Sequence, residues 1–131
     1  MAAAESYPDD LHYHRDHDWA RVDGDEAVLG ITWFAQDSLG ELVHFEAPAV
    51  GTTIALGAAY GEVESVKAVS DVIAPLSGEI IEVNEAVVDA PELVNDDPYG
   101  QGWLARIRLG DPAEVDGLLD ATAYGAYIAE Q

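Results

Sequence analysis

Short apolar runs separated by polar turns fill the first half of the chain. The runs at 19–22 and 26–31 flank the loop Asp23-Gly24-Asp25, and this arrangement predicts a β-hairpin. The run at 41–48, stopped by Pro48, and the β-branched run at 50–57 are expected to be further strands. Residues 32–40 differ, because Thr32 can cap a short helix that Gly40 ends.

Two later stretches are similar to each other. "GEVESVKA" starts at Gly61 and "GEIIEVNE" starts at Gly78, so that Lys67 aligns with Asn84. Each is interpreted as a strand followed by a turn, and residues 75–79 form a turn between strands. The pair indicates a quasi-two-fold β sandwich with one such turn in each half. A chance match between two short segments is the alternative.

The last third is expected to contain a loop, a strand and a helical end. "PELVNDDPYGQG", from Pro91, is interpreted as a long polar loop, and "GWLARIRLG" alternates as a half-buried strand. A helix follows, with Asp111 as N-cap, Pro112 at N1 and Glu114 at N3. Its apolar positions continue at helical spacing through Val115, Leu118, Leu119, Tyr124, Tyr127 and Ile128.

These elements predict a mostly-β protein with one short internal helix and a helical C-terminus. Its 131 residues and 49% hydrophobic content fit one domain, 1–131, with a buried core. Residues 1–10 are expected to be a flexible N-terminus, and residues from about 111 to 131 a helical segment. The lack of cysteine fits a reducing compartment, and the start has no features of a targeting peptide, so a cytoplasmic location is expected.

The charge is strongly negative, −21 at pH 7 with a pI near 4.1. Such a surface repels nucleic acid and anionic membranes, so neither is expected as a partner. Two compatible interpretations of the charge remain. It keeps the protein soluble, or it steers the protein toward basic docking sites on partner proteins.

Most catalytic signatures are missing from the sequence, which has no nucleophile elbow, phosphate-binding loop, cysteine nucleophile, zinc pattern or calcium loop. His12, His14 and His17 stand near Asp16 and Asp18, which would allow a weak metal site. Because their spacing matches no known site, surface histidines are the preferred interpretation and no metal is predicted.

Lys67 is the only lysine of the chain, and it falls between two expected strands. That position predicts an amine at a hairpin tip, the arrangement by which group carriers present biotin or lipoamide. Arginine cannot replace it there, because a guanidinium does not acylate readily. An ordinary exposed lysine is the alternative. A Schiff-base nucleophile is not expected, because the neighbouring acids Glu62, Glu64 and Asp71 favour the charged amine.

Four blocks of the sequence together resemble the H-protein family of the glycine cleavage system. They are "GITWFAQDSLGELV" at 30–43, "GEVESVKAVSD" at 61–71, "SGEIIEVNEAV" at 77–87 and "ELVNDDPYGQGWL" at 92–104. The resemblance spans about 11–128 and implies a lipoyl/biotinyl-type barrel-sandwich hybrid with Lys67 at a hairpin tip. It also implies lipoic acid amide-linked to Lys67, and Val66-Lys67-Ala68 favours lipoyl over the Met-Lys-Met of biotin carriers.

The resemblance implies a carrier of glycine catabolism and one-carbon metabolism that is not itself an enzyme. It would shuttle the aminomethyl group of glycine from a decarboxylase that uses pyridoxal phosphate to an aminomethyltransferase that uses tetrahydrofolate. It would also pass electrons to a dihydrolipoyl dehydrogenase that uses FAD and NAD, and a separate enzyme would lipoylate it. A monomer is implied. An H-like carrier that serves lipoyl relay or another redox system is the alternative.

The resemblance further implies a surface cleft whose acids hydrogen-bond the amine of the cargo. Asp18 stands where the family has glutamate in a His-Glu-Trp motif, and Asp71 matches directly, four residues after Lys67. Asp16 and Ser38 stand where members have serine and histidine. The four are candidates for the cleft, and Asp18, Asp16 and Ser38 depart from the residues that the family has there. The other interpretation is that the acids are ordinary solvated ones.

Overall fold

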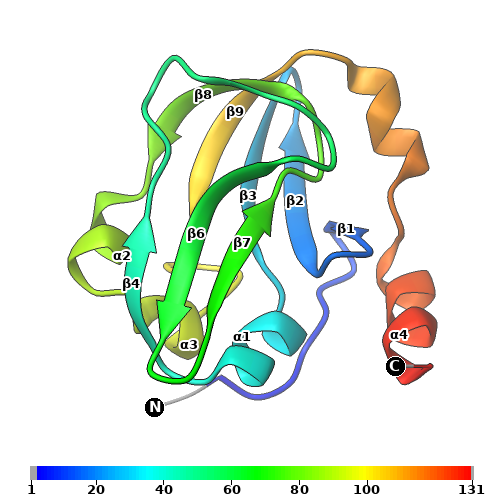
Figure 1. Ribbon diagram of the computed structural model, residues 1–131. Helices are drawn as coiled ribbons and strands as arrows, with labels where there is room; N and C mark the ends of the chain where they lie inside the picture. Colours follow the sequence, from blue (N-terminus) through cyan, green and yellow to red (C-terminus); the bar gives the residue numbers. More distant parts are fainter. Residues whose placement is uncertain (1–2, 131) are drawn as a thin grey trace.

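The computed structural model describes residues 3–130, which form two antiparallel sheets packed face to face (Figure 1). Within these residues one sheet has the strand order β1-β2-β3-β9-β8-β5 and the other the order β4-β6-β7. The strands are His12–His14 (β1), Asp18–Asp23 (β2), Glu26–Ile31 (β3), Leu42–Glu46 (β4), Thr53–Ile54 (β5), Ala59–Ser65 (β6), Val69–Ile73 (β7), Gly78–Val83 (β8) and Ala105–Leu109 (β9).

The space between the sheets is filled by the apolar side of each strand. β4 and β6 place Phe45 opposite Val63, and both side chains are buried. From the larger sheet, β8 and β9 contribute Ile80 and Ile107 as another buried cross-strand pair. Burial of each such side chain contributes roughly 1.5–3 kcal/mol. The β6–β7 hairpin therefore stands on a packed core.

Several predicted elements are confirmed. β2 and β3 pair from Asp23 opposite Glu26, with Gly24 in the left-handed region at φ 64°. The short helix is α1, Trp33–Leu39, whose N-cap Thr32 accepts a hydrogen bond from the backbone N–H of Ala35. Gly40 ends it at φ 83°. The strand predicted over 50–57 is shorter than expected, because only Thr53–Ile54 pairs with β8.

The loop predicted from Pro91 and the turn at Asn84 are in part wrong, because both contain helices. Asn84 is the buried N-cap of α2, Glu85–Asp89, and its amide donates to the carbonyls of Gln101 and Trp103. α3, Leu93–Asp96, lies within the predicted loop. Val87 in α2 and Val94 in α3 are completely buried. Their burial in the core stabilises helices in segments whose polar composition indicated a turn and a loop. The alignment of Lys67 with Asn84 therefore pairs an exposed residue with a buried cap.

The C-terminal segment is not one continuous helix. The 3₁₀ helix η1, Pro112–Gly117, starts at the predicted cap Asp111, and the separate helix α4, Ala121–Ala129, starts at Asp120. Between them Leu119 exchanges two backbone hydrogen bonds with Tyr13, both 2.8 Å. The carboxylate of Glu114 does not reach back to the N-cap. It accepts from the backbone N–H and the hydroxyl of Ser77, at 2.7 and 2.9 Å.

Residues 3–10, expected to be flexible, make several hydrogen bonds. The backbone N–H of Ala3 donates to Asn95, and the carbonyl of Ala3 accepts from the indole of Trp33. Tyr99 and Tyr13 donate to the carbonyls of Ser6 and Pro8. No helix in the part of the chain that the structure describes has the length and apolar character needed to cross a bilayer.

Candidate functional site at the lysine hairpin

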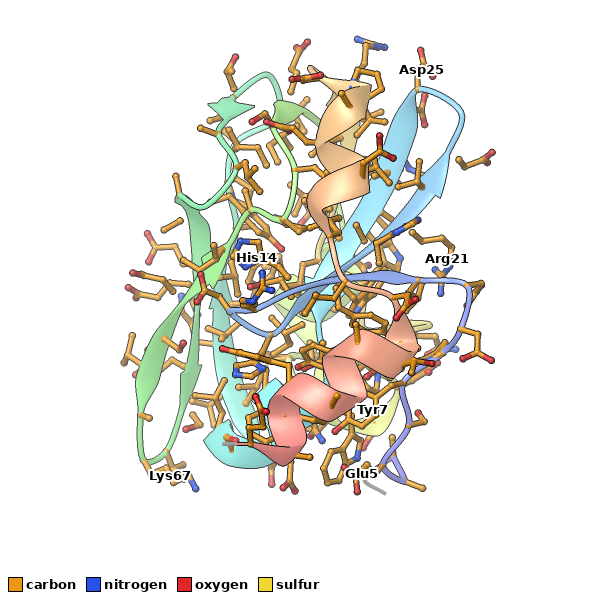
Figure 2. The ribbon with its side chains drawn as sticks, turned by 90° about the vertical axis from the view of Figure 1, so that its right-hand side faces the viewer. Glu5, Tyr7, His14, Arg21, Asp25 and Lys67 are labelled. Carbon is orange, nitrogen blue, oxygen red and sulfur yellow. The ribbon has the colours of Figure 1, made fainter. Side chains whose placement is uncertain are left out.

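Lys67 lies at the tip of the hairpin formed by β6 and β7, fully outside the core (Figure 2). The last register pair of the hairpin is Glu64 opposite Val69, and Val66, 86% exposed, precedes the lysine. The predicted position of the lysine at a hairpin tip is therefore confirmed. A group attached to its amine would extend into solvent.

Ser65 stabilises the backbone of this tip through hydrogen bonds. Its side chain is buried, and its hydroxyl oxygen accepts from the backbone N–H of Lys67 at 3.3 Å and of Ala68 at 3.2 Å. The backbone N–H of Ser65 donates to the carbonyl of Ala68 at 2.8 Å. A serine that satisfies backbone groups a few residues on is a recurrent turn device. This signal is present in the sequence, but the sequence-based prediction did not use it.

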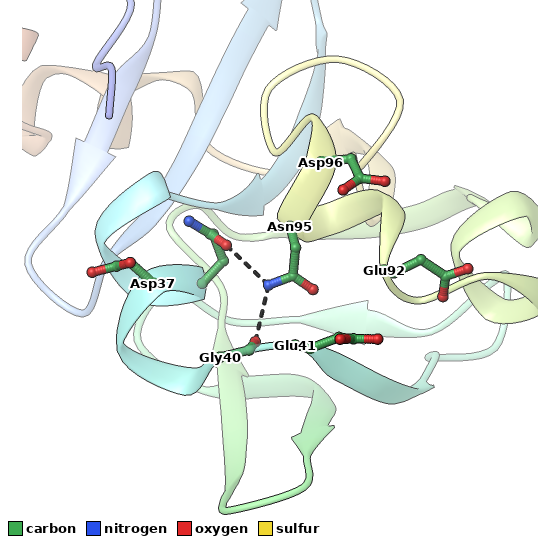
Figure 3. A pocket seen from close by; sticks show the side chains of 7 residues that line it. Asp37, Gly40, Glu41, Glu92, Asn95 and Asp96 are labelled. Atoms are coloured by element: carbon green, nitrogen blue, oxygen red, sulfur yellow. Dashed lines mark hydrogen bonds between the residues drawn. The ribbon is translucent and has the colours of Figure 1, made fainter. Parts of the chain in front are cut away.

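The stem of the lysine passes Gly40 at the end of α1. A methyl group added at Gly40 would lie 3.6 Å from Cε of Lys67. Gly40 also lines a recess of about 470 Å³ between α1 and α3 (Figure 3). The floor is Asn95, whose amide nitrogen donates to Gln36 and to the carbonyl of Gly40 and whose oxygen accepts from Leu42.

The rim of the recess is acidic, since it is lined by Asp37, Glu41, Glu92 and Asp96. The side-chain amide of Asn95 is hydrogen-bonded within the chain through both its nitrogen and its oxygen. The carboxylates of the rim are therefore the groups with which a ligand in the recess would interact. None of these acids was among the predicted cleft residues.

Asp18, the first cleft candidate, lies in the interior. It is 1% exposed and begins β2 in the larger sheet, while its carboxylate accepts from the backbone N–H of Ile73 in β7 at 3.3 Å. The bond ties one sheet to the edge of the other. Burial raises the pKa of Asp18 well above its usual range; the N–H of Ile73 opposes the shift, and the charge of Asp16 adds to it.

Tyr60 is a second buried polar group in this region, and the sequence-based prediction missed it. It lies at the start of β6, and its hydroxyl is buried without a hydrogen-bond partner among the described residues. Burial raises the pKa of Tyr60, and the charge of Asp18 raises it further. Asp18 and Tyr60 are both buried, so each polar group lies in a low-dielectric environment.

The other cleft candidates are exposed and lie on three different parts of the chain. Asp71 is exposed in β7, opposite Glu62. Asp16 is exposed in the turn after β1, with its carboxylate 3.5 Å from Nδ1 of His14. Ser38 is exposed on α1 and donates to the carbonyl of Phe34. The structure therefore places Asp18 inside, and the three others on separate elements.

His17, next to Asp18, holds the C-terminal helix in place. Its Nδ1 is 2.7 Å from the hydroxyl of Tyr124 in α4, which is also 2.8 Å from the hydroxyl of Thr32. His17 has φ 72°, a rare conformation for a residue with a side chain. Burial lowers the pKa of His17, so the neutral ring is favoured. The described residues contain no group of three or more His, Cys, Asp or Glu side chains arranged to hold a metal ion.

Comparison with known proteins gives one consistent result. A family model described as "Glycine cleavage H-protein" matches residues 11–131. The chain is 50% identical over 123 residues to the glycine cleavage system H protein of Symbiobacterium thermophilum, covering 94% of this chain and 96% of the relative. It is 49% identical over 125 residues to the H protein of Myxococcus xanthus, covering 95% and 97%.

The fold agrees as well. A crystal structure of a glycine cleavage system H protein from Mycobacterium marinum is similar with a TM-score of 0.83 and 42% identity. The match covers 93% of this chain and 98% of that one. The predicted fold class, mostly β of the lipoyl type with a short internal helix and a C-terminal helix, is confirmed.

Proposed function

Because the chain belongs to the glycine cleavage H-protein family, we propose that it is the lipoate-bearing carrier of the glycine cleavage system, with lipoic acid amide-linked to Lys67. The observation that carries the proposal is the position of the only lysine at an exposed hairpin tip. The protein is a carrier and not a catalyst. We place it in the cytoplasm, as a monomer.

The residues at the tip fit such a group. The buried hydroxyl of Ser65 holds the backbone of the turn, so the flexible side chain of Lys67 extends from a defined position on the hairpin. Gly40 lies beside the lysine stem, and its positive φ of 83° is a conformation that favours glycine there. When bound, lipoic acid supplies a disulfide that accepts a group and two electrons. The chain itself contributes a rigid mount and an acidic surface around it.

The partners follow from this role. They are a glycine decarboxylase that uses pyridoxal phosphate, an aminomethyltransferase that uses tetrahydrofolate, and a dihydrolipoyl dehydrogenase that uses FAD and NAD. A lipoylating enzyme precedes them. Each must reach Lys67, and the exposure of the tip allows all four to do so in turn.

Intact-mass measurement tests the proposal. Protein isolated from its own organism, with lipoate supplied, is expected to carry the mass of one amide-linked lipoyl group, and Lys67→Arg is expected to lose it. A wild-type chain without that mass contradicts the proposal. Glycine–bicarbonate exchange with the cognate decarboxylase then distinguishes glycine cleavage from another lipoyl-dependent role, because only the former predicts stimulation by the lipoylated protein.

Asp71, Asp16, Ser38 and Asp18 are proposed as the side chains that could hold the amine of the cargo. Asp71 and Asp16 are exposed, and Ser38 lies on the helix that ends at Gly40. Asp18 can join them only if its buried carboxylate gains access from the surface. Asp71→Asn is expected to shorten the lifetime of the cargo on the carrier while lipoylation proceeds normally. Equal lifetimes would assign Asp71 to the surface alone.

A further inference from the structure

The outer face of the three-stranded sheet bears a row of like charges. The strand register puts Glu46 opposite Glu62, and Glu62 opposite Asp71, so three carboxylates lie side by side across β4, β6 and β7. Directly opposed residues share one face of a sheet. Phe45 and Val63, their neighbours along the strands, are buried, so the acids face outward.

This row opposes folding. Like charges directly opposite each other in a sheet are destabilising. None of the ion pairs found among residues 3–130 includes Glu46, Glu62 or Asp71. The row therefore stands without a compensating cation of its own.

The other sheet shows that the chain can balance its acids. In β8 and β9 the register puts Glu79 opposite Arg108 and Glu82 opposite Arg106. Their side chains form ion pairs, with 3.0 Å between Nε of Arg106 and Oε1 of Glu82 and 3.8 Å between Nη1 of Arg108 and Oε1 of Glu79. Two of the four arginines of the chain thus form cross-strand ion pairs in the larger sheet. The unbalanced row is a local property of the sheet that carries Lys67.

Exposed valines lie on the same sheet, near the lysine. Val43 in β4, Val66 in the tip and Val69 in β7 are 49%, 86% and 58% exposed. The register puts Glu64 between His44 and Val69, so apolar and charged side chains are interspersed there, as they are at protein–protein interfaces. No described helix lies over this face, which is turned toward the viewer in Figure 1 and points to the left in Figure 2.

We propose that the outer face of β4, β6 and β7 is the docking surface for the proteins that act on Lys67. The occupant is a basic protein surface, with lysines or arginines set against Glu46, Glu62 and Asp71 and an apolar seat for Val66 and Val69. The inference rests on the proposed function, since that function requires partners at the tip. Charge complementarity selects this occupant, because the carboxylate row repels nucleic acid and anionic lipid.

Two double variants of the full chain with equal charge change test the proposal. Glu46→Gln/Glu62→Gln removes two charges from the row. Asp23→Asn/Asp25→Asn removes two from the β2–β3 turn, and Figure 2 shows Asp25 and Lys67 at opposite ends of the molecule. The rates to compare are lipoylation of each apoprotein by the cognate enzyme, and turnover of each lipoylated protein by the three glycine cleavage enzymes, at low and high salt.

The row variant is expected to lower kcat/KM about tenfold at low salt with at least one of these enzymes, and the difference should shrink at high salt. The turn variant should stay near wild type. The row variant should also unfold at a higher denaturant concentration than wild type, which separates lost docking from lost folding.

Equal kcat/KM for the two double variants with every enzyme overturns the docking surface and leaves the carrier function standing, because wild type works in the same assays. A wild-type chain that no enzyme lipoylates or uses overturns both proposals. An effect on the row variant that persists unchanged in high salt also overturns the electrostatic docking proposed here.

Discussion

Asp18→Asn should remove a pH-dependent loss of stability that the wild-type chain carries. The carboxyl is 1% exposed, and burial raises its pKa well above the 3.8 of the unfolded chain. The native state therefore holds a proton that the unfolded state has released, throughout the interval between the two pKa values. Stability from this group is fully present below pH 3.8 and is lost as the pH rises through the folded pKa.

The size of the effect follows from one proton. A single group with this behaviour lowers the free energy of unfolding by up to about 1.4 kcal/mol for each pH unit inside the interval. The asparagine variant would have no such slope, and its carbonyl oxygen could still accept from the backbone N–H of Ile73. Its new NH₂ group adds a cost of about 1–3 kcal/mol if it finds no partner, but that cost does not change with pH.

The measurement is therefore a difference between two pH profiles. Urea unfolding of wild type and Asp18→Asn, from about pH 4 to 9 at constant ionic strength, gives the free energy of unfolding at each pH. The difference should move in favour of the variant as the pH rises, while Asp25→Asn should run parallel to wild type. Parallel profiles for wild type and Asp18→Asn would refute the reasoning, whatever their separation.

Three further changes test other parts of the fold. Tyr124→Phe leaves the ring nitrogen of His17 without its 2.7 Å partner and should cost about 1–3 kcal/mol in urea unfolding, whereas Tyr127→Phe should cost less. Because burial lowers the pKa of His17, wild type should lose stability as the pH falls below 6.5, by up to about 1.4 kcal/mol per unit; His17→Gln should flatten that slope. Gly30→Ala should lower the unfolding free energy by about 1–3 kcal/mol, because its Cβ would lie 2.6 Å from the indole of Trp19; an unchanged midpoint would contradict the packing.

The sequence allowed the prediction of elements whose ends are chemically marked. Thr32 and Gly40 bracket α1, and the Gly24 turn sets the β2–β3 hairpin, because caps and left-handed glycines act locally. α2 and α3 were missed for the opposite reason. They exist because Val87 and Val94 find places in the core, and only the tertiary structure supplies those places.

The same distinction between local signals and tertiary packing applies to the candidate site. Lys67 could be predicted, because its rarity and its position between two strands are visible in the chain. The burial of Asp18 could not be predicted, because Asp16 and Asp18 are the same residue type two positions apart in the sequence. One is exposed and the other is 1% exposed because the backbone turns at His17, with φ 72°, and sends the next side chain inward. The sequence offers no marker of that turn.

The burial of Asp18 bears directly on how the lysine is held. β7 begins two residues after Lys67 and ends at Ile73, whose backbone N–H donates to Asp18 in the other sheet. β7 therefore starts just after Lys67 and ends at the hydrogen bond that ties the two sheets together. β7 is the edge strand of its sheet, so only one of its sides pairs with β6. The bond to Asp18 gives a partner to a backbone N–H that an edge strand can otherwise leave unpaired. The bond from Ile73 uses one of several acceptor sites of the Asp18 carboxyl. What limits a role of Asp18 in holding cargo is its burial, at 1% exposure, and its observed contact ties the lysine hairpin to the other sheet.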